Sequence, residues 1–75
     1  MANYYKEIKK ANQWIDEIIR NVAEEGKEVI IDKILLEGTN LFEVSEKVFL
    51  KRIELHQRLD PFIKVENGLL YYGDR

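Results

Sequence analysis

Three cations, Lys47, Lys51 and Arg58, are spaced so that they share one side of a helix. At about 100° per residue they fall within an arc of about 40°. Such side chains bind phosphate oxygens or guanine edges, although charged stripes on helices are most often only solvated. Residues 45–64, which carry the stripe, have a local charge of +2, whereas residues 1–44 sum to −3. The stretch with the stripe is therefore locally positive in a chain whose formal net charge is −2.

Other kinds of chemistry have little support. The chain has no cysteine, which excludes disulfides, thiolate metal sites and cysteine nucleophiles, and its one histidine, His56, cannot form a histidine cluster. Its four glycines are too scattered to form a phosphate-binding loop. We therefore expect no enzyme, no metal site and no cofactor. The lack of cysteine and of any long apolar run favours a cytoplasmic protein without a transmembrane helix.

At 75 residues the chain is expected to form one domain, 1–75, that starts with a long helix at 3–25. Apolar residues recur there at steps of four and three, namely Tyr4, Ile8, Ala11, Ile15, Ile18 and Val22. Asn3 is a suitable N-cap, and Gly26 is placed to end the helix. Trp14 lies about 80° from this stripe, so it should cover the rim of the core or face a partner.

The next segment allows two interpretations. In the first, the β-branched residues within 28–31 form a short strand, and a helix follows at 32–37. In the second, residues 27–37 form one helix, because their apolar residues also keep helical spacing. In both cases Gly38 is predicted to end the helix, which leaves a long connection to the next element.

A second secure helix is expected at 45–59, with Ser45 as its N-cap and Asp60-Pro61 as its stop. Its apolar side carries Val48, Leu55 and Leu59. Arg52 lies near that side, where we expect it to cover the edge of the core or pair with an acid, and His56 should be a partly buried packing residue.

The segment 62–72 predicts a β-hairpin, because Asn67-Gly68 is the signature of a type I′ turn between two β-favouring runs. This turn pairs Glu66 with Leu69 and, further out, Ile63 with Tyr72. The core face is then expected to hold Ile63, Val65, Leu70 and Tyr72. The outward face is expected to hold Lys64, Glu66 and Tyr71.

This order of elements, together with Val44-Ser45-Glu46-Lys47-Val48-Phe49-Leu50-Lys51-Arg52-Ile53, resembles the winged helix-turn-helix family. The resemblance implies an α+β fold of three helices with a C-terminal hairpin wing. Abundant Ile, Lys, Glu and Tyr also resemble the composition of small regulators from hyperthermophilic archaea and their viruses or plasmids.

In that family the second helix of the pair enters the major groove of double-stranded DNA. The resemblance therefore implies a transcriptional regulator whose recognition helix spans 45–59 and whose wing, 62–72, lies alongside. The residues implied on the DNA side are Ser45, Glu46, Lys47, Leu50, Lys51, Glu54, Arg58, Lys64 and Asn67. An exposed Tyr71 could also reach phosphate.

A homodimer is expected as well, because two-fold dimers commonly supply the second recognition helix. Its contacts are expected along the first helix, at Tyr4, Tyr5, Ile8, Trp14 and Ile15. The alternative function is a winged-helix adaptor that binds protein and leaves the basic stripe in solvent.

Overall fold

A single long helix begins at the first described residue. The computed structural model describes residues 4–73, and α1 (Tyr4–Glu25) occupies the first 22 of them. The N–H of Gly26, whose φ is 67°, donates to the carbonyl of Val22 at 3.0 Å, so the expected end of the helix is confirmed. The expected cap, Asn3, lies outside the described residues. The buried positions recur every three or four residues: Ala11, Ile15, Ile19 and Val22.

The ambiguous segment is a short strand followed by a helix. Strand β1 (Val29–Ile30) is only two residues long, and α2 (Ile31–Leu41) follows it directly. The prediction that Gly38 ends this helix is wrong, because α2 continues through it for another three residues. A Cβ at Gly38 would lie 2.5 Å from Phe49 Cζ, so this glycine allows α2 to pass close over an aromatic ring.

The connection to the next helix is consequently short. A four-residue turn, Phe42-Glu43-Val44-Ser45, joins α2 to α3 (Glu46–Leu59). The predicted helix at this place is confirmed, but the connection that precedes it is a tight turn and not the long connection that was expected. Ser45 precedes α3 in an extended conformation but makes no side-chain cap hydrogen bond. The helix ends at Leu59, and its C-cap is Asp60, whose carboxylate accepts a hydrogen bond from the N–H of Phe62 at 3.1 Å.

The hairpin has the predicted register. Strands β2 (Ile63–Glu66) and β3 (Leu69–Tyr72) pair Ile63 with Tyr72 and Glu66 with Leu69. Asn67 and Gly68 have φ values of 52° and 75°, as a type I′ turn requires. β3 also pairs with β1, so the sheet is antiparallel with the order β1-β3-β2.

Burial on the hairpin differs from the prediction at two residues. Tyr71, expected to point outward, is only 6% exposed, and its hydroxyl donates to Glu66 Oε2 at 2.8 Å. It lies on the central strand next to Leu70, which is 0% exposed, so both faces of β3 are covered there. Val65, expected in the core, is 39% exposed because it lies on the edge strand β2 near the turn.

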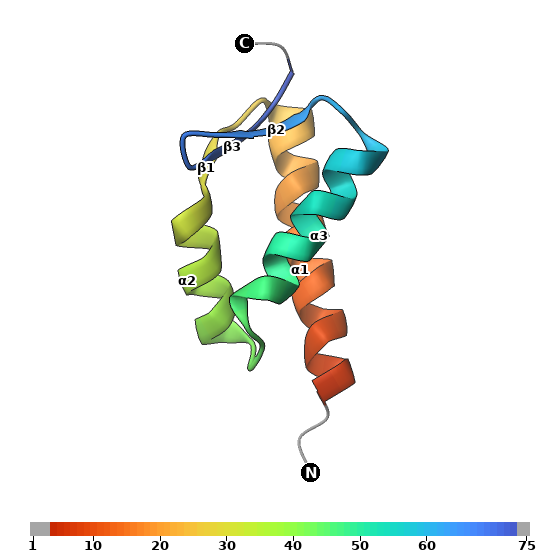
Figure 1. Ribbon diagram of the computed structural model, residues 1–75, viewed down its shortest axis with the longest axis vertical. Helices are drawn as coiled ribbons and strands as arrows, with labels where there is room; N and C mark the ends of the chain where they lie inside the picture. Colours follow the sequence, from red (N-terminus) through yellow and green to blue (C-terminus); the bar gives the residue numbers. More distant parts are fainter. Residues whose placement is uncertain (1–3, 74–75) are drawn as a thin grey trace.

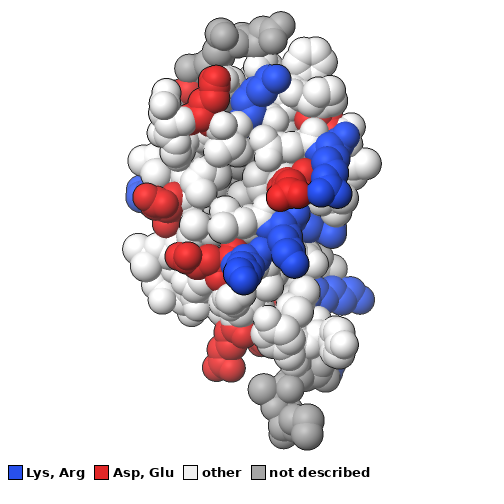
Figure 2. All heavy atoms as spheres, in the orientation of Figure 1, with Lys and Arg blue, Asp and Glu red and all other residues white. Residues whose placement is uncertain are grey.

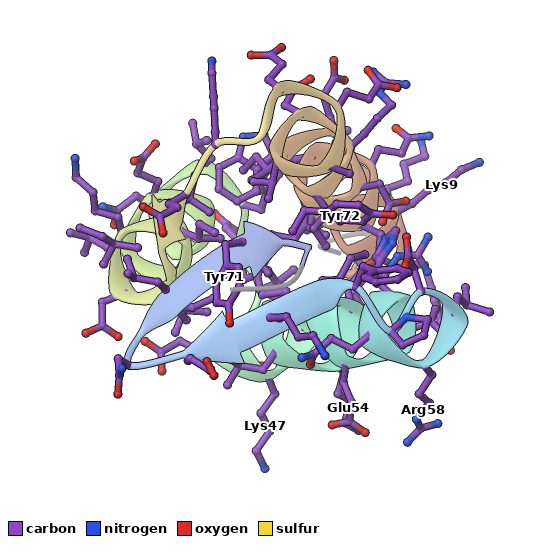
Figure 3. The ribbon with its side chains drawn as sticks, turned by 90° about the horizontal axis from the view of Figure 1, so that it is seen from above. Lys9, Lys47, Glu54, Arg58, Tyr71 and Tyr72 are labelled. Atoms are coloured by element: carbon purple, nitrogen blue, oxygen red, sulfur yellow. The ribbon has the colours of Figure 1, made fainter. Side chains whose placement is uncertain are left out.

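The three helices pack around a common core (Figure 3), and the sheet lies across one end of them (Figure 1). The core between them includes Phe49, Ile15, Leu70 and Val22 as its largest fully buried side chains. The prediction that Ile15 contacts a second copy is wrong, since it is 0% exposed within its own core. The start of α1 extends beyond the other helices (Figure 1), and residues 4–10 include no buried residue. This α+β architecture is compatible with a winged helix.

Candidate nucleic-acid interface

The outer side of α3 gathers most of the residues that the sequence placed at a DNA contact. Lys47, Glu54 and Arg58 point away from the body of the protein on this helix (Figure 3). The stripe from Lys47 to Arg58 spans about 17 Å at 1.5 Å per residue. The exposed residues on and beside it are Ser45, Glu46, Lys47, Leu50, Lys51, Glu54 and Arg58. In Figure 2, blue side chains gather over the front face that α3 crosses, with red carboxylates beside them.

The cations of the stripe are not equivalent. Arg58 Nη2 donates to Glu54 Oε1 at 2.8 Å, in an i, i+4 ion pair whose side chains are 73% and 61% exposed. Such exposed pairs contribute little to stability, typically less than about 1 kcal/mol. Within residues 4–73, neither Lys47 nor Lys51 forms an ion pair. These two ammonium groups are therefore the ones most accessible to an anionic partner.

The opposite side of α3 is fixed to α1 by one carboxylate. Arg52 donates from Nε and Nη2 to the two oxygens of Asp16, both at 2.8 Å, and His56 Nε2 lies 2.6 Å from Asp16 Oδ1. Bidentate guanidinium–carboxylate pairs of this kind fix orientation as well as distance. The expectation that Arg52 pairs with an acid is thus confirmed, and so is the partial burial of His56.

The same contacts perturb the ionisation of the clamp formed by Asp16, Arg52 and His56. Hydrogen bonds from Arg52, and more weakly from His56, lower the pKa of the Asp16 carboxyl to about 2. Partial burial of the carboxyl acts in the opposite direction and raises its pKa. In return, the carboxylate raises the pKa of Arg52. Asp16 therefore stays ionised at any physiological pH, and it holds α3 so that the cationic stripe faces outward.

Sequence reasoning missed Asp16. It lies 36 residues before Arg52, and nothing local indicates that the two side chains meet. The available signal was its position in α1 directly after buried Ile15, which places a carboxylate at the margin of the apolar stripe.

Aromatic rings hold the turn between α2 and α3. The Trp14 ring packs edge-on against Phe42 at a centroid distance of 5.8 Å and against Phe49 at 5.6 Å. Phe42 opens the turn, and Phe49 lies one turn into α3 beneath Gly38. Trp14 therefore covers the rim of the core, which was one of its two predicted places.

The hairpin contributes less to this surface than the sequence suggested. Lys64 is partly exposed on β2, the strand that lies next to α3. Asn67 is exposed, but the structure does not bring it to the cations of α3, because the carbonyl of Gly68 accepts a hydrogen bond at 2.9 Å from the N–H of Ile31 at the start of α2 (Figure 1). Tyr71 is buried and bonded to Glu66, so it is not available to bind phosphate.

Two other kinds of site were searched for among the described residues. No group of three or more His, Cys, Asp or Glu residues within 4–73 could hold a metal ion. None of the helices in this part of the chain has the length and apolar character needed to cross a bilayer. Comparisons with protein-family models, with curated proteins and with solved structures found no match to this chain. A functional interpretation therefore depends on the geometry of the surface alone.

Proposed function

We propose that this chain is a winged helix-turn-helix protein that binds double-stranded DNA through α3 and regulates transcription as a homodimer. The observation that carries the proposal is the outward stripe on α3, where Lys47 and Lys51 lack ion-pair partners within the described residues. The helix that carries them is the second of two joined by the four-residue turn 42–45. In helix-turn-helix proteins, that second helix lies in the major groove.

The roles within the stripe follow from position and charge. Lys47 and Lys51 lie in the N-terminal half of α3, the part that reaches base edges in this docking mode, and they would bind guanine or phosphate. Arg58, at the far end, would contact the backbone. Leu50 is 44% exposed and could contact a thymine methyl group.

The experiment measures affinity for duplex DNA at several salt concentrations. Each phosphate contact contributes about 0.9 to the slope of log K against log salt, so Lys47→Ala/Lys51→Ala should reduce the slope by almost 2. The matched control is Lys9→Ala/Lys10→Ala, which removes the same charge from two exposed positions on α1. Of these two residues, Lys9 points away from the stripe (Figure 3). Equal losses in the two variants, or binding insensitive to salt, would contradict a contact through α3 and favour the protein-binding adaptor.

The dimer would use the projecting end of α1. Tyr4 and Tyr5 are 50% and 85% exposed there, and Ile8 lies partly buried beside them. Ile8 packs partly against the protein's own core, whereas the two exposed rings are left to a second copy of the chain. Tyr4→Ser/Tyr5→Ser should then shift the mass measured by light scattering from dimer to monomer. A wild-type protein that is monomeric at all concentrations would refute this part of the proposal.

A further inference from the structure

An open groove of about 270 Å³ lies between α1 and α3, which pack against each other (Figure 1). Its apolar wall consists of Ile8 on α1 and of Val48 and Leu55 on α3. Val48 and Leu55 are about 10 Å apart along the helix axis, at 1.5 Å per residue, so an extended alkyl chain can lie along the groove. The volume is just below the range of sites for drug-sized ligands, roughly 300–1,000 Å³, so the groove suits one short chain.

The polar side chains of the groove can all donate hydrogen bonds: Asn12, Lys51 and Arg52. Within residues 4–73, Lys51 has no ion-pair partner, and the side-chain amide of Asn12 makes no hydrogen bond to the protein. The charge of Arg52 is balanced by that of Asp16, its bidentate partner. Among the described residues no acidic side chain lines the groove, so its remaining charge of +1 is that of Lys51.

The charge and the apolar wall together indicate the chemistry of the ligand. An ammonium group beside branched aliphatic side chains is complementary to a molecule with one negative charge at the end of an alkyl chain. We propose that the groove binds a short-chain aliphatic carboxylate. Its carboxylate pairs with Lys51 and accepts a hydrogen bond from Asn12, and its chain displaces water from the aliphatic wall.

Occupation of the groove has a consequence for DNA affinity, which rests on the proposed function. Lys51 also belongs to the outward stripe of α3, and an ammonium group paired with a carboxylate is not available to a phosphate. A saturating carboxylate should therefore lower the slope of log K against log salt by about 0.9, the contribution of one phosphate contact. The slope of the Lys51→Ala variant should not respond to the carboxylate.

The test follows the methyl groups of Ile8, Val48 and Leu55 by NMR in the absence of DNA. The protein is titrated at constant ionic strength with three probes. Hexanoate is compared with hexylammonium, which has the same chain and the opposite charge, and with acetate, which has the carboxylate without the chain. We expect saturable shifts with hexanoate alone. From butanoate to hexanoate the affinity should rise about two- to fourfold for each methylene group, because the groove removes it from water.

Two matched pairs of variants on α3 separate the groove from its surroundings. Lys51→Gln should weaken hexanoate binding by about threefold, whereas Lys47→Gln, which removes the same charge outside the groove, should weaken it less. Leu55→Gln should reduce the gain in affinity per methylene group. Leu50→Gln, at a similarly exposed position outside the groove, should leave that gain unchanged.

Equal binding of hexanoate and hexylammonium, equal losses in Lys51→Gln and Lys47→Gln, or no saturable shift in the millimolar range would overturn the proposal. Shifts of Val48 and Leu55 that follow protein concentration without ligand would also overturn it, because a second copy of the chain would then occupy the groove. These titrations contain no DNA, so their failure is distinct from a failure of the proposed function. If hexanoate binds and the salt slope is the same with and without it, the consequence for DNA affinity is refuted.

Discussion

Replacement of Gly38 by alanine tests the close contact between α2 and α3. The added Cβ would lie 2.5, 2.8 and 2.9 Å from three atoms of the Phe49 ring, whereas carbon atoms pack best at about 3.5–4.0 Å. The ring would have to move by about 1 Å. It is 0% exposed and packed against Trp14, so it has no free space into which to move.

Two opposing terms determine the magnitude. Overpacking of a filled core typically costs about 1–3 kcal/mol. Alanine is favoured over glycine inside a helix by about 1 kcal/mol, and this gain offsets part of the cost. Because the contacts are so short, we expect an overpacking cost at the upper end of that range. After the gain in helix propensity is subtracted, the free energy of unfolding should fall by about 1–2 kcal/mol. For a domain of this size, that corresponds to a fall of about 5–15 °C in Tm.

The assay is thermal and urea unfolding, followed by circular dichroism and by Trp14 fluorescence. Asn40→Ala is the matched control, since Asn40 is exposed on the same helix and alanine adds helix propensity there without a clash. Phe49→Leu supplies a second comparison. In the double variant Gly38→Ala/Phe49→Leu, the combined loss should be smaller than the sum of the two single losses, because the smaller side chain relieves the clash.

The reasoning would be refuted if Gly38→Ala were as stable as the wild type. It would also be refuted if the losses in the double variant simply added. Either result would mean that α2 does not pass as close to Phe49 as the structure has it.

Three further predictions concern the clamp, the stripe and the turn of the hairpin. Because folding lowers the pKa of Asp16 from 3.8 to about 2, its contribution to the free energy of unfolding is present above about pH 4 and is lost as pH falls toward 2. Allowing for partial screening, this contribution is about 1–2 kcal/mol, so the stability difference between wild type and Asp16→Asn should shrink across that interval; a difference independent of pH would contradict it. Glu54→Gln should increase affinity for duplex DNA severalfold in a binding titration, because it removes a negative charge that repels the DNA phosphates and frees Arg58 from its ion pair. Glu17→Gln, which removes a similar exposed ion pair on α1, should not change the affinity. Gly68→Ala, at a φ of 75°, should lower the free energy of unfolding by about 1 kcal/mol in urea titrations, and an unchanged midpoint would argue against the type I′ turn.

Local signals identified the elements that local chemistry determines. The register of the hairpin follows from Asn67-Gly68, since only one pairing is compatible with a two-residue turn. The helix at 46–59 lies where Ser45 and Pro61 bound it, and α1 follows from a sustained apolar repeat. In each case the determining residues lie within a few positions of the structure that they specify.

The errors arise where distant residues decide. Gly38 has the sequence context of a helix stop, yet a ring 11 residues away in the chain is the reason for the glycine. Tyr71 was expected in solvent because hairpin strands often alternate, but β3 is the central strand of a three-stranded sheet. An acid was expected beside Arg52, but nothing local identifies it as Asp16, which lies 36 residues earlier in the chain. The stripe on α3 was therefore predictable, whereas the clamp that orients it was not.

The order of the sheet has a consequence for how the chain folds. β3 follows β1 and β2 in the sequence but lies between them, and its pairing with β1 joins residues about 40 positions apart. Neither outer strand pairs with the other, so no sheet exists until β3 is inserted. Closing such a long loop is slow compared with forming local helices. We therefore expect the three helices to form early, and the amide of Ile31, which is bonded to the hairpin turn, to gain protection from hydrogen exchange only in the final step of folding.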